Sequence, residues 1–503
     1  MFSTENKESA SRSISVNRAL LMSCAGAWLI VAAAALIATG STRMTAPEKA
    51  LDLSRQIALW SAPAIILPLL ICRVALRQMW SKTLGYVLAA LAALTCLGVA
   101  VNIAGWCPDF DVASPDFGGM HTDQEREWTV ACAIKYGTPL NFTPNNGYPL
   151  LINFIWRIFG HSILPVALFS AFCTVLAAGV TAATAARLLP HLQATKSAVC
   201  AAALFAIVPS IAWYGSICMK EAPVILAMSL CTYTLASIWR GQLSLSSLAS
   251  IALGGMMLLL LKSPLGWWLM LGACAAATHA LLSQKKGRRE GTLGGALCVM
   301  LVAAAVVAGG REFRSKPDSL LFQTQAHTTP RVESLDSAML GYSTVRPYAK
   351  ILGSYYTLPI AGRIARLPFT ATAQYFPPFP WNFNRDAAIG RFVPWAHMPL
   401  WYPVGGCVLG FIVLCLGRRN RAASMGLWAA WVGACWCGVA LVAAGSVARY
   451  WLPLLPAMIP MAVQFLACAH SGTISRRSFA IYSFSYLLLL IIALLAAYIS
   501  LNP

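Results

Sequence analysis

The sequence predicts an all-α polytopic membrane protein with about 13 transmembrane helices, and three observations support this prediction. First, 58% of the 503 residues are hydrophobic and only 11% are charged, whereas soluble domains average about 25% charged residues. Second, apolar runs of about 20 residues, the length that crosses a bilayer as a helix, recur along the chain. Third, Lys and Arg gather in alternate links between these runs, as in cytoplasmic loops.

The apolar runs define the predicted transmembrane helices. They lie at about 19–40, 57–76, 84–104, 162–186, 197–215, 221–239, 246–262, 264–283, 292–309, 399–417, 424–445, 449–469 and 479–500. The first run is too long for a signal-peptide core, so we expect an uncleaved helix. The 41–56 segment is predicted to be an outer loop, and Lys262 either is a charge within a helix or ends one.

An odd number of spans places the two termini on opposite sides of the membrane. With the N-terminus in the cytoplasm, every inner link carries Lys or Arg, so we expect a multi-pass inner-membrane protein of this orientation. The excess of 37 Lys and Arg over 17 Asp and Glu is then explained by retention of cytoplasmic loops. No nucleic-acid partner is expected.

Two segments are too long to be simple connections, and such loops are usually functional. The predicted organisation is 1–104 with three transmembrane helices, 105–161 as a first external loop, 162–309 with helices four to nine, 310–398 as a second external loop, and 399–503 with helices ten to thirteen. We expect the chemistry in the two loops, on the extracytoplasmic face.

The 16 cysteines do not form a metal or disulfide framework. The chain has no CxxC pair, and most cysteines lie inside apolar runs, where they behave as small buried hydrophobic residues. Cys107, Cys132 and Cys218 lie in predicted external segments, where one disulfide could form.

The first external loop contains a predicted short helix between Asp123 and Ile134. Thr122 or Asp123 can cap its N-terminus, and Gly137 ends it. Trp128, Ala131 and Cys132 share one apolar stripe, which we expect to lie on the membrane surface.

The loop also concentrates carboxylates. Glu125 and Glu127 are expected to form a solvated charged face. Asp109 and Asp111, two positions apart in a loop, could hold a divalent cation. Because no other ligand pattern is present, no metal site is assigned and no cofactor is certain.

The predicted helix and the segment after it resemble the start of the GT-C class of membrane glycosyltransferases. The resemblance rests on Asp123, Trp128, Ala131 and the pair Tyr136-Gly137, followed by GYPLLINFIWRIFG over 147–160. The similar branch contains the protein O-mannosyltransferases and the lipid A aminoarabinose transferases. In that branch an Asp-Glu pair precedes an aromatic residue, and a YPL or PPL turn follows.

Later motifs resemble exopolysaccharide-associated members of the same class. These are AIVPSIAWYGS over 206–216 with MKEAP over 219–223, YFPPFPW over 375–381 and RYWLPLLP over 449–456. The similarity covers about 105–240, and elsewhere only the architecture. The family's Asp-Glu pair stands four residues before the aromatic, whereas Asp123 stands five before Trp128 and is followed by Gln124. Asp111 is therefore the alternative to Asp123.

The resemblance implies a GT-C-like fold and an enzyme that moves a sugar from a polyprenyl-phosphate carrier to a glycan, lipid or protein acceptor. Such a reaction requires a carboxylate that deprotonates the acceptor hydroxyl and cations that stabilise the departing phosphate. Asp123 suits the role of the base, and the resemblance implies inversion at the anomeric carbon.

Four cations are candidates for the phosphate. Lys220 stands at the outer end of the 221–239 run, where it could instead form a structural ion pair with Glu221. Arg449 stands at the outer end of a late run. Arg363 and Arg366, one helical turn apart, could bind a phosphate or the headgroups of membrane lipids.

Aromatic residues in the loops are candidates for sugar or acceptor contact. They are Tyr375 and Trp381, in a proline-rich segment that excludes a regular helix, and Trp128. The alternative for such residues is an interfacial aromatic belt.

Two other functions share these features. The first is a polysaccharide polymerase or ligase that uses a lipid-diphosphate-linked glycan. The second is a transporter or flippase for lipid-linked sugars, which requires charges within the spans. Such charges are scarce here. The sequence also has no Gly-rich phosphate-binding loop that could bind a nucleotide sugar.

Overall fold

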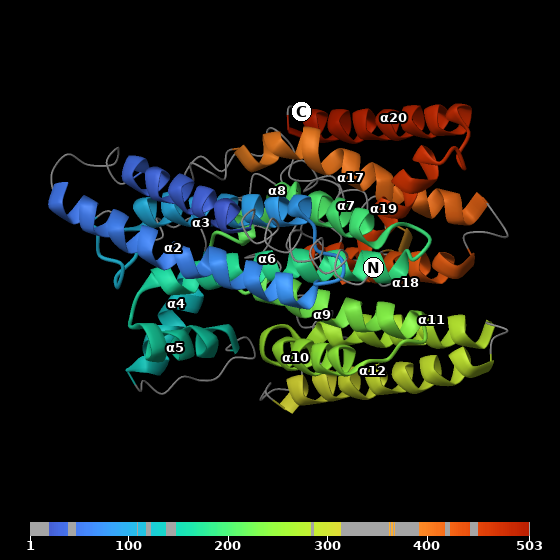
Figure 1. Cartoon of the computed structure of the whole chain (residues 1–503), viewed down its shortest axis with the longest axis horizontal. Coiled ribbons are helices and arrows are strands. Elements are labelled where there is room, and N and C mark those ends of the chain that lie inside the picture. The colour runs from blue at the N-terminus through green and yellow to red at the C-terminus, as the bar shows by residue number, and fades with distance from the viewer. Residues whose placement is uncertain are drawn as a thin grey trace, which may run out of the picture. The chain divides into compact units, whose positions relative to one another are not determined.

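The computed structural model is helical, with no strand among the residues that it describes (Figure 1). Those residues are 20–38, 47–107, 109–116, 122–136, 147–282, 286–312, 362, 364, 365, 367, 392–417, 423–442 and 451–501. Eight helices in this part of the chain are long and apolar enough to cross a membrane. The chain is therefore an all-α membrane-embedded protein, as predicted. A count of thirteen spans stays a prediction.

The eight helices lie within the predicted apolar runs or extend them. They are Leu20–Ala38, Glu48–Ala75, Lys82–Trp106, Ile163–Leu188, Glu221–Trp239, Ser263–Leu282, Thr292–Gly309 and Leu452–His470. Shorter apolar helices occupy Ala194–Ala206, Leu245–Leu261, Pro399–Cys415 and Met425–Val439. The length of the apolar runs was therefore enough to locate these helices along the chain.

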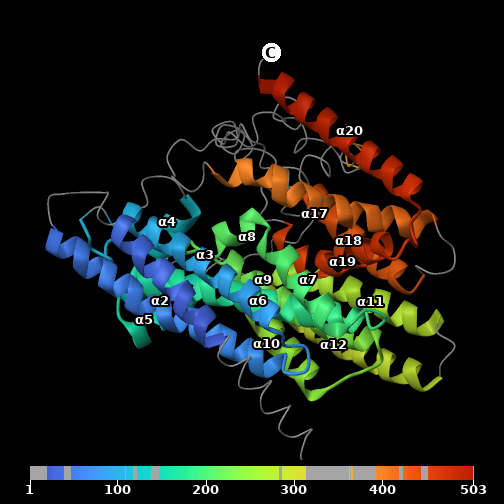
Figure 2. The ribbon, with the colours of Figure 1, turned by 45° about the horizontal axis from the view of Figure 1, so that its top comes forward.

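Three helix boundaries differ from the prediction made from the sequence or make it more specific. The predicted outer loop 41–56 is wrong in its second half, because α2 (Pro47–Ala75) already begins at Pro47. The 197–215 run is broken into α7 (Ala194–Ala206) and α8 (Pro209–Tyr214), since proline cannot donate the helical hydrogen bond (Figure 2). Lys262 is the C-cap of α10 (Leu245–Leu261), so it ends a helix.

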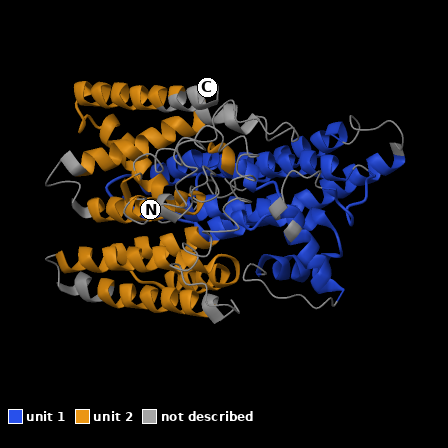
Figure 3. Ribbon diagram, turned by 180° about the vertical axis from the view of Figure 1, so that it is seen from behind, with its two compact units in different colours: residues 1–140, 146–206, 211–226 blue, residues 141–145, 207–210, 227–503 orange. Residues whose placement is uncertain are grey.

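The chain divides into two compact units (Figure 3). Unit 1 comprises residues 1–140, 146–206 and 211–226, and unit 2 comprises 141–145, 207–210 and 227–503.

In unit 1, α2, α3 (Lys82–Trp106), α6 (Ile163–Leu188) and α7 pack against one another. The buried residues of α6 are mostly small, which lets neighbouring helices approach closely. Two shorter helices, α4 (Thr122–Lys135) and α5 (Gly147–Phe159), pack side by side, and α5 also contacts α6. Gly160, with φ at +88°, lies between α5 and α6, a backbone conformation that glycine adopts without strain.

In unit 2, α10, α11 (Gly266–Leu282) and α12 (Lys286–Glu312) pack together, and the short 3-10 helix η1 (Ser263–Leu265) leads into α11. A second group contains α17 (Phe392–Gly417), α18 (Ala423–Val442) and α19 (Leu455–His470), with η3 (Leu452–Leu454) before α19. The last helix, α20 (Arg476–Leu501), contacts α17 and exposes many large apolar side chains, as a lipid-facing helix does.

The last helix described in unit 1, α9 (Glu221–Trp239), begins there and continues into unit 2. The functional candidates whose surroundings the structure describes all lie in unit 1.

Candidate functional site

The short helix predicted over 123–134 is present as α4, which spans Thr122–Lys135. Residue 123 therefore lies in the first turn of α4. The side chain of Asp123 lies outside the described residues.

The apolar stripe of α4 packs against protein, so the expectation that it lies on the membrane surface is wrong for these side chains. Trp128 is only 7% exposed, and its ring stacks on His161 and meets the edge of Trp156 at 4.8 Å between ring centroids. Ala131 is fully buried, and its carbonyl oxygen accepts a hydrogen bond of 3.1 Å from Asn153 Nδ2. The indole of Trp128 is thus engaged in holding α4 and α5 together.

His161 closes this α4–α5 contact. Its Nε2 lies 3.7 Å from the sulfur of Cys132. Partial burial, helped by the positive charge of Lys135 and opposed by Asp111, lowers the pKa of His161. Burial also raises the pKa of the Cys132 thiol, against the effect of Lys135. Both groups are therefore neutral at physiological pH.

The central feature of the site is an ion pair between α4 and the start of α9. Lys220 Nζ lies 3.4 Å from Glu127 Oε1, although the two residues are 93 positions apart. Glu127 is buried, so the expected solvated face is wrong for Glu127, whereas Glu125 is exposed as expected. The alternative ion pair of Lys220 with Glu221 is not formed among the described residues, since Lys220 reaches across to Glu127 on α4 instead.

The ammonium of Lys220 keeps capacity for a ligand. An ammonium has three N–H donors, and among the described residues Lys220 donates only to Glu127. Its side chain is 17% exposed. The group can therefore bind a second acceptor without leaving its partner.

The segment that carries Lys220 is anchored to α3. Asn102 Nδ2 donates to the carbonyl oxygen and the hydroxyl of Ser216, and that hydroxyl in turn donates to the carbonyl of Trp213. The main-chain carbonyl oxygen of Lys220 accepts a hydrogen bond from the amide of Val224 in the first turn of α9. Sequence reasoning missed Asn102, although an amide side chain within an apolar run is a signal worth following.

Several polar groups of unit 1 are buried without a well-formed hydrogen bond. Glu221 Oε2 and the hydroxyl of Tyr148 belong to this set, which also includes Gln124 and Ser170. Burial, reinforced by Cys218, Glu127 and Glu221 and opposed by a hydrogen bond with Ser170, raises the pKa of Tyr148 well above its ordinary value. The phenol is thus a hydrogen-bond donor at any physiological pH. Sequence reasoning gave no role to Tyr148 or Ser170, and it named Glu221 only as a possible partner of Lys220.

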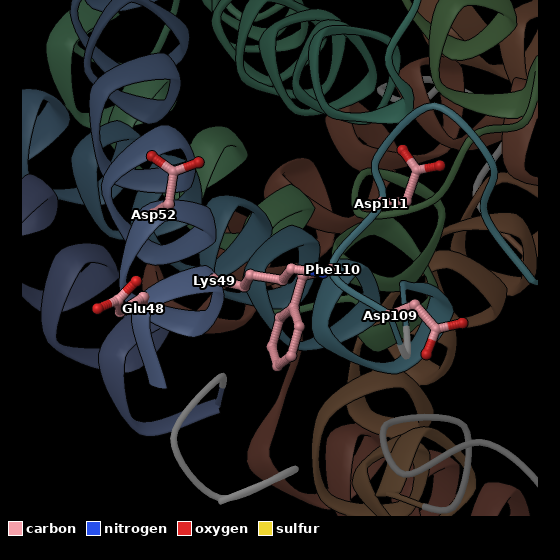
Figure 4. A pocket seen from close by; sticks show the side chains of 6 residues that line it. All are labelled: Glu48, Lys49, Asp52, Asp109, Phe110 and Asp111. Carbon is pink, nitrogen blue, oxygen red and sulfur yellow. The ribbon is translucent and has the colours of Figure 1, made fainter. Parts of the chain in front are cut away.

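Asp111 lies in a different place, an open acidic groove of about 390 Å³ in unit 1 (Figure 4). The groove is lined by residues from the start of α2 and from the loop after α3, namely Glu48, Lys49, Asp52, Asp109, Phe110 and Asp111. Asp111 Oδ1 accepts a hydrogen bond of 2.9 Å from the amide of Ala113. In Figure 4 the carboxylates of Asp109 and Asp111 do not converge.

No group of three metal-ligating side chains occurs in the described part of the chain. A divalent cation at Asp109 and Asp111 therefore stays a prediction.

The cysteines named for a disulfide are free thiols in this structure. Burial, reinforced by Asp111, raises the pKa of Cys107 to about 12, and burial also raises that of Cys218. Both thiols stay protonated and unreactive.

Five other candidates lie outside the described residues. They are Arg363, Arg366, Tyr375, Trp381 and Arg449.

Comparison with known proteins found no match, either among the family models or among curated proteins. The fold and the site define the class of the protein, which is an all-α membrane-embedded chain. In it a buried ion pair ties the helix of the first predicted external loop to the start of α9.

Proposed function

We propose that the chain is an integral membrane glycosyltransferase that moves a sugar from a polyprenyl-phosphate carrier to an acceptor on the extracytoplasmic face of the inner membrane. The observation that carries this proposal is the contact of 3.4 Å between Lys220 and Glu127. It brings the helix that contains Asp123 to the cation proposed to bind the donor phosphate.

The spacing along α4 supports a shared site. Residue 123 precedes Glu127 by one helical turn, a rise of about 6 Å along the axis. The carboxylate that removes the proton and the ammonium that binds the phosphate must reach opposite sides of one sugar carbon, so both have to belong to one site.

The proposed reaction is an in-line displacement with balanced steps. Asp123 accepts the proton of the acceptor hydroxyl, and the acceptor oxygen forms a bond to the anomeric carbon. The bond from that carbon to the phosphate oxygen breaks, and its electron pair stays on the phosphate. Lys220 stabilises the resulting charge, and the anomeric carbon is inverted.

Asp123 is favoured over Asp111 as the base. Asp111 already accepts from the amide of Ala113 and lies on the acidic groove beside α2. Trp128 is given no sugar contact, because Trp156 and His161 pack against its ring. Five further residues stay proposed contacts. They are the cations Arg363, Arg366 and Arg449 for the phosphate, and the aromatic residues Tyr375 and Trp381 for the sugar.

The test uses the full chain, purified and reconstituted in vesicles with a polyprenyl-phosphate-linked hexose and an acceptor glycan. The readout is release of polyprenyl phosphate. Asp123→Asn is expected to lower the rate by about 100-fold or more, and Lys220→Gln is expected to lower it through weaker phosphate contact. Glu125→Gln and Lys135→Gln, exposed positions on the same helix, are the matched controls and should keep the wild-type rate.

Three results would contradict the proposal. Turnover that survives Asp123→Asn would remove the base. Turnover with a lipid-diphosphate-linked glycan alone would identify a polymerase or ligase. Transbilayer movement of the lipid-linked sugar without any release of lipid phosphate would identify a flippase.

A further inference from the structure

The turn between α2 and α3 carries three cations and no carboxylate. Arg73 lies in the last turn of α2, Arg77 lies in the connecting turn, and Lys82 begins α3. Arg77 and Lys82 are exposed, and Arg73 is half-buried. No Asp or Glu occurs between positions 53 and 108 of the sequence. The α2–α3 turn therefore carries positive charge only.

A tryptophan in the turn fixes one of these cations in place. The guanidinium carbon of Arg73 lies 5.9 Å from the centre of the Trp80 ring, which is within the range of a cation–π contact. Trp80 in turn packs on the first turn of α3, since a Cβ atom at Gly85 would lie 3.2 Å from Cζ2 of its ring. The indole has no acceptor for a conventional hydrogen bond, so the N–H donors of Arg73 stay available for a phosphate.

A stripe of exposed apolar side chains on α2 leads to this turn. Leu67, Leu70, Ile71 and Val74 have the spacing of one helix face, and their side chains are 51%, 45%, 47% and 77% exposed. Arg77 follows three positions after Val74. The cations thus begin where the apolar helix ends, as the headgroup of a lipid begins where its acyl chains end.

We infer that the α2–α3 turn and the apolar stripe beside it form a binding surface for an anionic phospholipid. The phosphate of the lipid contacts Arg73, Arg77 and Lys82, and its acyl chains lie along the stripe. Each Lys or Arg near a membrane surface favours anionic lipids. Three cations without a carboxylate therefore favour a headgroup of net negative charge over a zwitterionic one. The indole of Trp80 lies at the level of the headgroups, where tryptophan is enriched.

Retention of positive loops in the cytoplasm explains why this link carries Lys and Arg, but it does not require a cation held against a ring. The turn lies on the predicted cytoplasmic side, where the leaflet contains anionic lipids. A free anion such as inorganic phosphate would contact the same cations but leave the apolar stripe uncovered. The inference does not depend on the proposed glycosyltransferase function, since the surface contains none of the residues proposed for it.

The experiment places the full chain in phosphatidylcholine vesicles with a trace of photoactivatable phosphatidylglycerol, and mass spectrometry measures the label on residues 67–86. We expect unlabelled phosphatidylglycerol to compete for this segment and inorganic phosphate not to compete. Arg73→Gln, Arg77→Gln and Lys82→Gln should each raise the amount of phosphatidylglycerol needed for half-competition by about fivefold, the effect of one cation at a membrane surface. High salt should act in the same direction.

Two matched controls separate charge in the turn from other effects. Arg77→Lys keeps the charge at an exposed position, so it should keep the wild-type half-competition. Lys135→Gln removes a cation that also lies 5.9 Å from the centre of a tryptophan ring, that of Trp156. Because Lys135 belongs to α4, this variant should leave the labelling of 67–86 unchanged. Trp80→Leu should weaken competition as Arg73→Gln does, since the guanidinium loses the ring that orients it.

Three outcomes would overturn the inference. Competition by added phosphatidylcholine as strong as that by phosphatidylglycerol would show an ordinary lipid boundary without preference for charge. Competition by inorganic phosphate would show a site for a free anion. The same half-competition in the wild-type protein and in all three Gln variants would show that the cations of the turn do not contact the headgroup.

Discussion

The side-chain amide of Asn102 on α3 bonds to two oxygens of Ser216, at 3.1 Å to the carbonyl and 3.2 Å to the hydroxyl, across 114 positions of the chain. This contact fixes the segment that leads to Lys220 against α3. The position of the cation in the proposed site therefore depends on a residue that touches no substrate.

Replacement of Asn102 by leucine should weaken both the fold and the site. The change keeps the branching of the side chain but removes the donors to Ser216, at an expected cost of about 1–3 kcal/mol. Thermal unfolding in detergent and release of lipid phosphate should both decline. Thr95→Val on the same helix is the control, since Thr95 bonds only to carbonyls of its own helix. Unchanged turnover in Asn102→Leu would contradict a positioning role.

Gly98 should not tolerate a side chain. A Cβ atom at this position would lie 2.6 Å from Ser216 Cβ and 2.9 Å from its hydroxyl oxygen. We expect Gly98→Ala to lower the free energy of unfolding by about 1–3 kcal/mol. Gly105→Ala, on the same helix with nothing within 4 Å, should instead stabilise slightly through helix propensity. Equal melting temperatures for the two variants would refute the close approach.

The two members of the ion pair should differ in their effect on stability. Lys220→Met leaves the buried carboxylate of Glu127 without its cation, at an expected cost of about 1–3 kcal/mol. Glu127→Gln costs less, because the Lys220 side chain is 17% exposed and can reach water. The double variant Lys220→Met with Glu127→Leu should recover part of the loss. Melting temperatures that fall equally in both single variants would argue against this asymmetry.

Acid should loosen the contact between α4 and α5 through His161. Its pKa is lowered from 6.5 in the folded protein, so below that value the unfolded chain binds more protons than the folded one. Stability is therefore full above about pH 6.5 and is lost as pH falls toward the lowered pKa. The drop in melting temperature from about pH 7.5 to about pH 5.5 should shrink in His161→Gln. It should persist in His191→Gln, an exposed control.

The sequence predicted well those parts of the fold that depend on local composition. The apolar runs coincide with helices, and the helix expected over 123–134 is α4. The candidate site was predicted less completely. Lys220 was named for the donor phosphate, with an ion pair to Glu221 as the alternative, and its partner in the structure is Glu127.

Two features show why the rest could not be predicted. The stripe through Trp128 and Ala131 showed which face of α4 is apolar, but periodicity does not tell a membrane surface from a protein partner. The burial of Tyr148 and Glu221 depends on the packing of α5 and on the start of α9. Those segments are far apart in the chain, and the composition of neither segment indicates what packs against it.

What the sequence by itself determined is that the chain is an α-helical membrane protein and where its helices run, because hydrophobic length and composition are properties of each segment alone. Only the tertiary structure decided that Glu127 is buried beside Lys220 and that Asn102 holds Ser216. Those pairings arise when helices pack and exclude water, since a charge or an amide without water is stable only where the fold brings it a partner.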